Sequence, residues 1–125
     1  MGRLKEIVFD CAHAAQLARF WAALIDGYAV RAYDDAEIAR LAALGFTPDT
    51  DPTVMVDGPG PSLCFQQMPA RHHDANRIHL DIAVESRRSA VATALERGAT
   101  FVREAEGYTV LADPEGNRFC LVGPV

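Results

Sequence analysis

Two side chains suited to acid–base chemistry, His79 and Asp81, lie two residues apart in the strand-like segment Arg77–Val84. Alternate residues of a strand point to the same face, so both share the face opposite the segment's apolar residues. Histidine titrates near neutral pH, and a neighbouring carboxylate can orient it or bind a polar group of a substrate. We therefore predict a catalytic or ligand-binding role for His79 and Asp81. The alternative for each is a structural polar residue hydrogen-bonded to a neighbour.

An earlier strand-like segment, Leu4–Cys11, places Glu6 where the later segment places His79. Each segment is followed by a helical pattern with a leucine three residues before a closing glycine, so the two stretches read as copies of one unit. Equivalent residues of two copies can converge on one site, which makes Glu6 a candidate general base or metal ligand. Its alternative is an exposed glutamate at the end of a strand. Asp10 lies further along the same face and is predicted to line the site.

Three cysteines, Cys11, Cys64 and Cys120, are far apart and form no CxxC pair. An odd count without a secretion signal is typical of reduced thiols in the cytoplasm, where we expect this protein. Cys64 and Cys120 could supply thiolates to a zinc ion. The alternative is the commoner role of free cysteine as a small buried hydrophobic residue.

The elements that must position these residues are two strand–helix–strands units. The first copy continues with strand-like sequence at 28–33, 53–56 and 62–67, interrupted by a short helix near 35–45. The second copy continues with a helix near 86–97 and strands at 100–103, 108–112 and 118–122. Apolar residues recur at helical spacing in all three helices. In the first they are Leu17, Phe20, Trp21 and Leu24, and Phe20 and Trp21 fit packing in the core or in an interface. In the last, Val91 and Leu95 are expected to face inward, and Ile38, Leu41 and Leu44 form a stripe between them that must be buried somewhere.

Length and composition limit the classes of protein. The chain has 125 residues, half of them hydrophobic and 23% charged, which fits one globular domain. Its formal net charge of −5 disfavours nucleic acid or an anionic membrane as a partner. No apolar run is long enough to span a bilayer, and the chain starts with a strand rather than a signal peptide.

Three motifs together resemble one superfamily. They are the segments "DPEGNRFCLV" at 113–122 and "NRIHLDIAV" at 76–84, and the N-terminal strand leading to Phe20-Trp21. This pattern resembles the glyoxalase/bleomycin-resistance/dioxygenase superfamily, also called vicinal oxygen chelate, and its glyoxalase-like subgroup in particular. The resemblance implies an α+β fold in which two βαβββ modules, at about 3–68 and 76–125, form a curled mixed sheet around a pocket with the helices outside.

The resemblance also implies where a metal would bind. Metal-using members place His, Gln or Glu in the first strand of each module and Glu in the last strand. These positions correspond to Glu6 and His79, and to Cys120 in place of a glutamate; the first module offers Cys64, or Gln66 in another register. Two expected carboxylates are therefore replaced. We expect no tightly bound metal, with a divalent ion at Glu6, His79 and Cys120 as the alternative, zinc being the ion best suited to a thiolate.

Two functions follow from this resemblance. One is a small-molecule lyase or isomerase of the glyoxalase type, with Glu6, His79 and Asp81 in catalytic roles. The other is a non-catalytic protein of the bleomycin-resistance type that sequesters a drug or metabolite. In both, Asp10, Cys64, Gln66 and Cys120 are predicted to contact a small molecule in a pocket between the modules.

Relatives of this kind cover their strand edges by pairing, so we also predict a homodimer. The helix near 35–45 should either join the dimer contact or cover the pocket.

Overall fold

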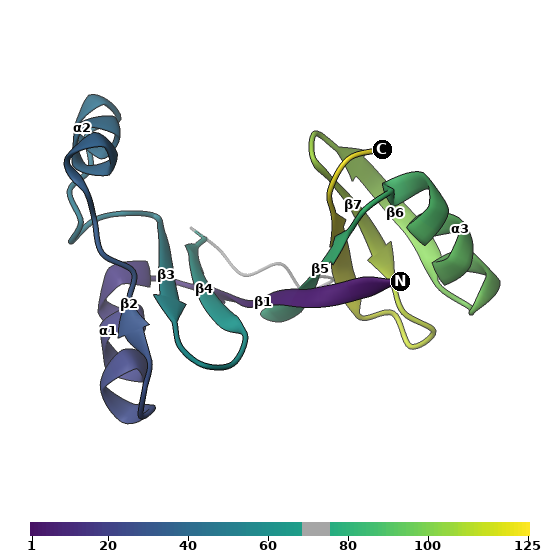
Figure 1. The fold of residues 1–125 in the computed structure, drawn as a ribbon, viewed down its shortest axis with the longest axis horizontal. Helices are drawn as coiled ribbons and strands as arrows, with labels where there is room; N and C mark the ends of the chain where they lie inside the picture. The colour runs from purple at the N-terminus through teal and green to yellow at the C-terminus, as the bar shows by residue number, and fades with distance from the viewer. Residues whose placement is uncertain (69–75) are drawn as a thin grey trace. The chain divides into compact units, whose positions relative to one another are not determined.

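The computed structural model describes residues 1–68 and 76–125 (Figure 1). Strand, helix and three strands occur twice along the chain, which confirms the α+β fold with two βαβββ modules. The first copy comprises β1 (Gly2–Cys11), α1 (Ala14–Leu24), β2 (Ala29–Val30), β3 (Thr53–Asp57) and β4 (Ser62–Gln67), with α2 (Asp35–Ala43) inserted after β2. The second comprises β5 (Ile78–Val84), α3 (Arg87–Glu96), β6 (Thr100–Ala105), β7 (Tyr108–Ala112) and β8 (Arg118–Val122).

The chain divides into two compact units, which are described separately. One unit contains Met1–Ile7 and the second copy, and the other contains the first copy from Val8 onward. Strand β1 thus contributes residues to both units. α3 ends at the cap residue Arg97, and Gly98 follows with a φ of 104°. α1 ends earlier than its glycine: its cap is Ile25 in an extended conformation, and Gly27, with a φ of 82°, lies two residues further on. Glycine adopts this left-handed conformation without a steric penalty, so Gly98 ends α3 where the sequence predicts, whereas Gly27 belongs to the turn that follows α1.

The unit with the second copy has its strands in the order β5-β8-β7-β6. β5 runs parallel to β8, while β8, β7 and β6 are antiparallel neighbours. The core of this unit is formed by α3 against the sheet and contains the buried residues Val84, Ala90, Ala94, Leu111 and Leu121, with Ile82, Val91 and Phe119 packed against them. Strand alternation in the sequence predicts Leu80, Ile82, Phe119 and Leu121 on the face toward the helices, and this is confirmed at Ile82, Phe119 and Leu121.

Two residues expected inside this unit are largely exposed. Leu80 of β5 is 41% exposed and Leu95 of α3 is 43% exposed. In α3 the alanines Ala90 and Ala94 are buried instead, because a helix lies closest to a sheet where its side chains are smallest. The prediction of an inward Leu95 was therefore wrong.

The unit with the first copy packs α1 against β3 and β4. β3 and β4 are antiparallel, with Val54 opposite Phe65 and Val56 opposite Leu63, and these four residues are buried. The ring of Phe9 stacks on that of Phe65, with 5.1 Å between their centroids. The core thus combines an aromatic pair with aliphatic strand residues.

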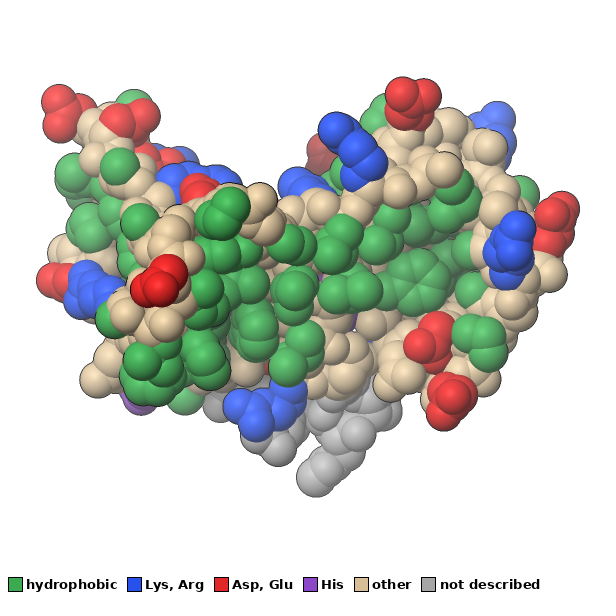
Figure 2. Space-filling view, turned by 60° about the horizontal axis from the view of Figure 1, so that its bottom comes forward, with side chains coloured by type: hydrophobic (Ala, Val, Ile, Leu, Met, Phe, Trp, Pro, Cys, Tyr) green, Lys and Arg blue, Asp and Glu red, His purple; other side chains and the backbone are tan. Residues whose placement is uncertain are grey.

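α1 presents small residues to this core. Ala14, Ala15 and Ala18 are buried, whereas Phe20 and Leu24 are 54% and 61% exposed. Phe20 and Leu24 therefore do not belong to this core, and packing of Phe20 and Trp21 in an interface stays a prediction. Figure 2 shows that hydrophobic side chains are common on the surface of the protein. The homodimer that would cover such side chains stays a prediction.

α2 begins where the sequence predicts. The Asp34 side chain accepts a hydrogen bond from the backbone N–H of Glu37 at 2.8 Å and caps the helix. Leu41 is 1% exposed, but Ile38 and Leu44 are 42% and 61% exposed. Only the middle residue of the predicted stripe is therefore buried, and the lid or dimer role of α2 stays a prediction. Among the described residues, no helix is long and apolar enough to cross a membrane.

Candidate functional site

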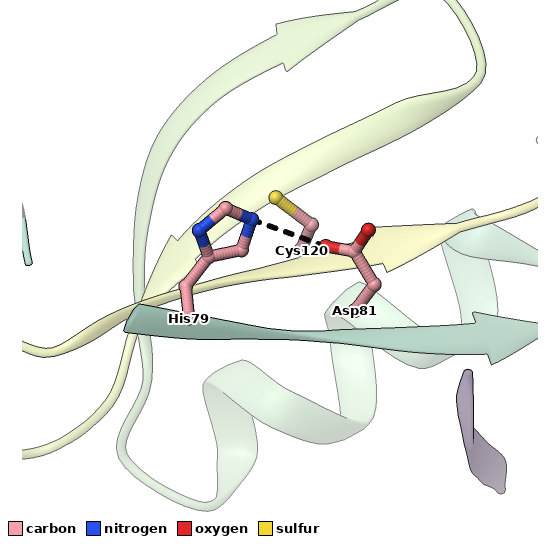
Figure 3. A group of neighbouring side chains, drawn as sticks. All are labelled: His79, Asp81 and Cys120. Carbon is pink, nitrogen blue, oxygen red and sulfur yellow. Dashed lines mark ion pairs between the residues drawn. The ribbon is translucent and has the colours of Figure 1, made fainter. Parts of the chain in front are cut away.

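Strand pairing in the unit with the second copy brings three chemically active side chains together. The parallel register of β5 and β8 places Asp81 opposite Cys120. His79 shares a face with Asp81 because it lies two residues earlier in the same strand. Figure 3 shows all three side chains projecting to the same side of the two strands. The structure thus brings together three of the residues predicted to form the site.

The three side chains meet around one nitrogen of the imidazole. His79 Nε2 lies 3.3 Å from Asp81 Oδ1, and the ligand atoms of all three residues are within 4.8 Å of one another. The Sγ of Cys120 lies on the same side of the ring as Asp81, while the second ring nitrogen points away from both (Figure 3). A nucleophile–base–carboxylate relay needs its two outer groups at opposite nitrogens. The arrangement is therefore not a cysteine-nucleophile triad.

The ion pair between His79 and Asp81 is largely shielded from water. Their side chains are 21% and 16% exposed. The contact with Asp81, followed by that with Cys120, raises the pKa of His79 from 6.5 to about 10, although burial acts in the opposite direction. The imidazole of His79 is therefore protonated at neutral pH.

One carboxylate oxygen of the site lacks a conventional hydrogen bond. Asp81 Oδ1 is buried and, among the described residues, has no hydrogen-bond partner, so its contact with His79 is an ion pair of unfavourable hydrogen-bond angle. A buried acceptor in this state has unused capacity for a proton or a ligand.

The metal site that the resemblance implies can be tested on these donors. An imidazole nitrogen, a carboxylate oxygen and a sulfur, all mutually within 4.8 Å, match the ligand types and number of a catalytic zinc site. Asp81 Oδ1, which accepts no hydrogen bond from the described residues, is consistent with such a site. His79, Asp81 and Cys120 would hold the ion, which would supply Lewis-acid chemistry once the imidazole lost its proton. Magnesium and calcium prefer oxygen-only sets and fit poorly.

Glu6, the fourth predicted residue of this unit, lies outside this group. Glu6 is 8% exposed, and its carboxylate oxygen Oε1 lies 3.5 Å from Lys5 Nζ. Among the described residues, the only group of three or more potential metal ligands consists of His79, Asp81 and Cys120. The catalytic or ligand role of Glu6 therefore stays a prediction.

The remaining predicted residues, Asp10, Cys64 and Gln66, belong to the unit with the first copy. Cys64 is buried, and the Gln66 side chain donates a hydrogen bond to the sulfur of Met68 at 3.6 Å. Their place in one pocket with His79 stays a prediction. Two adjacent histidines between the predicted modules, His72 and His73, form a poor chelating pair by sequence because consecutive residues diverge, and they lie outside the described residues.

One buried polar pair was not anticipated from the sequence. The Tyr33 hydroxyl donates a hydrogen bond to Asp51 Oδ2 at 2.8 Å, and Asp51 is only 4% exposed. The two residues are separated by α2 and the loop that follows it. Neither position belongs to a periodic pattern in the sequence. The only signal in the sequence is that Asp51 is an acidic residue shortly before a predicted strand.

Comparisons with known proteins agree with this fold. The model of the glyoxalase-like domain family matches residues 6–122. A solved structure of an NAD-dependent benzaldehyde dehydrogenase from Legionella pneumophila is similar with a TM-score of 0.63 at 12% identity, covering 96% of this chain and 98% of the other. A glyoxalase/bleomycin resistance protein/dioxygenase superfamily member from Vibrio splendidus 12B01 gives 0.57 at 10% identity, covering 98% and 99%.

Methylmalonyl-CoA epimerase from Streptomyces coelicolor is similar with a TM-score of 0.54 at 14% identity, covering 98% of this chain and 97% of the other. No curated protein sequence gives a significant match. At these identities the solved structures show the fold alone.

Proposed function

Because the chain belongs to the glyoxalase-like domain family, we propose that it is a lyase or isomerase that moves a proton on a small carbonyl compound. The observation that carries the proposal is the shielded His79–Asp81 pair, in which Asp81 Oδ1 accepts no hydrogen bond. A carboxylate and an imidazolium at one place supply a base and an electrophile together. That combination suits abstraction of a proton from the carbon next to a carbonyl group.

The reaction can be written with these two groups alone. Asp81 takes the proton as the C–H bond breaks, and the electron pair of that bond becomes the double bond of an enolate. The His79 imidazolium donates a hydrogen bond to the enolate oxygen, where the negative charge develops. Return of the proton from Asp81 to a neighbouring carbon gives the isomer. Loss of a leaving group from the neighbouring carbon gives the lyase product.

Cys120 has a positioning role in this proposal. Its sulfur lies beside the imidazole and contributes, after Asp81, to the raised pKa of His79. The thiol therefore helps to keep the imidazole protonated, and its polarizable sulfur borders the space in which a substrate would lie.

Exchange of carbon-bound hydrogen with solvent tests the proposal without knowledge of the natural substrate. The full chain is incubated in deuterium oxide with hydroxyacetone, pyruvate or propionyl-CoA, and loss of the α-proton signal is followed by proton NMR. We expect enzyme-dependent exchange of at least one probe. Asp81→Asn should lower the rate by about 10²-fold or more, because loss of a positioned base typically has that effect.

The matched control is Glu85→Gln, which removes an exposed carboxylate just beyond the end of β5. It should exchange at the wild-type rate. Equal exchange by wild type and Asp81→Asn would overturn the assignment of the base.

A non-catalytic binding protein is the second candidate. The observation that favours it is Cys120, because metal-using members of the superfamily that the sequence resembles have a glutamate at that position. In this case His79 and Asp81 would be polar anchors for a sequestered compound. Native mass spectrometry of the purified protein separates the two: a co-purifying apolar compound, together with no α-proton exchange, supports the binding protein.

A further inference from the structure

The unit with the first copy contains a cavity that the proposed reaction does not use. It has a volume of about 470 Å³ and is lined by residues of the segment 31–34, of α2 and of β3. This volume lies within the range of sites for small organic molecules. Ala32, Ala36 and Met55 supply apolar wall, and Tyr33 and Asp51 supply polar groups.

Asp51 places a buried carboxylate in the wall of this cavity. It is 4% exposed, and it accepts one hydrogen bond from the Tyr33 hydroxyl at 2.8 Å and one from the backbone N–H of Thr53 at 3.0 Å. Burial, followed by this hydrogen bond, raises the pKa of Tyr33, so the phenol stays protonated and acts as a donor. A carboxylate has about four acceptor positions, so Asp51 can accept further hydrogen bonds.

The arginines around the cavity already have their own carboxylate partners. Arg31 binds Asp57 through Nε at 2.7 Å and through its second guanidinium nitrogen at 2.9 Å. Arg40 binds Glu37 in the same two-pronged way, at 3.1 and 2.6 Å. The pKa of Arg40 is raised chiefly by Glu37 and only last by the charge of Asp51.

Among the ion pairs formed by the described residues, none includes Asp51. A buried charge without a direct counter-ion is unfavourable, and a bound cation relieves it. An anion would meet this carboxylate and two guanidiniums that are already occupied, so it fits the cavity poorly.

We propose that this cavity binds a small organic cation, a primary amine on a short apolar body, whose ammonium group donates hydrogen bonds to Asp51. The apolar body would contact Ala32, Ala36 and Met55. The Tyr33 hydroxyl holds the carboxylate in position by donating a hydrogen bond to Oδ2. The cavity belongs to the unit with the first copy, and it does not depend on the reaction proposed for His79 and Asp81.

Three probes of similar shape and different charge test the proposal: benzylamine, benzyl alcohol and benzoate. Each is titrated into the full-length, ¹⁵N-labelled protein at pH 7, and amide shifts are followed by NMR. We expect saturable shifts in residues 31–55 with benzylamine. Benzyl alcohol and benzoate should bind at least about tenfold more weakly, because a hydrogen bond between charged groups is worth more than a neutral one. Benzoate binding as tightly as benzylamine would overturn the proposal.

Two variants locate the site. Asp51→Asn keeps the shape of the side chain and removes its charge, so benzylamine affinity should fall about tenfold or more. Ala36→Trp fills the cavity from α2, leaves the charge in place, and should abolish the shifts; it keeps the test valid if Asp51→Asn does not fold. The matched control, Asp49→Asn, changes an exposed carboxylate two residues away that pairs with Arg19, and it should bind as wild type does. Unchanged affinity in Asp51→Asn or in Ala36→Trp, with the variant folded, would overturn the proposal.

Discussion

The two copies of the βαβββ unit start their helices with different chemistry. The first residue of α1 is Ala14, which is fully buried, and the first residue of α3 is Arg87, which is 6% exposed. Ala14 lets its helix lie close to the sheet. Arg87 reaches across its unit to bind Glu104 at 2.6 Å and the carbonyl of Ala105 at 3.0 Å. One topology is therefore stabilised by close apolar packing in one copy and by a buried polar anchor in the other.

The first strands of the copies differ in the same way. His79 and Asp81 in β5 correspond to Glu6 and Val8 in β1, and Val8 is 2% exposed. The second copy therefore keeps two ionisable groups on one face, whereas the first replaces one of them with a core residue. The comparison shows that the duplicated fold conserves strand positions while the chemistry at those positions diverges.

The largest effect should come from removing the polar anchor of α3. Arg87→Ala should lower the free energy of unfolding by about 2–3 kcal/mol, measured by urea denaturation. The buried guanidinium loses bonds to Glu104, Ala105 and Thr109, but Glu104 is half-exposed and regains water, which limits the loss. Arg88→Ala is the control, because its side chain is exposed and the change should stay within about 0.5 kcal/mol. If Arg87→Ala and Arg88→Ala lowered the free energy of unfolding by the same amount, the stabilising role of the buried Arg87 contacts would be refuted.

A pH-dependent contribution to stability should distinguish the second copy. Since the pKa of His79 is raised from 6.5 to about 10, the folded state holds a proton that the unfolded state releases. The contribution is therefore fully present below pH 6.5 and is lost as pH rises towards 10. Between pH 6.5 and pH 10, the unfolding free energy of the wild type should fall by on the order of 1–3 kcal/mol relative to that of His79→Gln. This range allows for residual screening by solvent.

Urea denaturation of both proteins at several pH values between 6 and 10 checks this prediction. His13→Gln, which changes an exposed histidine of the first copy, should follow the wild-type curve. If the difference in unfolding free energy between wild type and His79→Gln stayed constant from pH 6 to pH 10, it would contradict the raised pKa of His79.

The sequence predicts the strands of this fold better than the faces of its helices. Alternation identifies the inner face of β5 at Ile82 and Val84, because a strand has only two faces. A helix can turn any side to a sheet, and α1 turns the side with its alanines rather than the side with Phe20 and Leu24. Hydrophobicity alone does not reveal that preference, because close backbone approach depends on side-chain size.

The candidate site was predicted to the extent that local spacing determines it. His79 and Asp81 share a face because they lie two residues apart in one strand, and the superfamily pattern identified Cys120. Tyr33 and Asp51 meet only because α2 and its following loop return the chain to the start of β3. Such a contact depends on the path of a loop, and no periodic pattern records it.

The smallest expected difference concerns the caps that precede the two helices. Ser86 caps α3 by accepting a hydrogen bond from the N–H of Ser89 at 3.3 Å, whereas His13 makes no side-chain cap at α1. Ser86→Ala should therefore lower the free energy of unfolding by about 1 kcal/mol, and His13→Ser should raise it by about 0.5 kcal/mol. Urea denaturation at pH 7 measures both. If His13→Ser brought no gain while Ser86→Ala was destabilising, a missing cap would not be what separates the two helix starts, and the difference would rest on Ala14 and Arg87 alone.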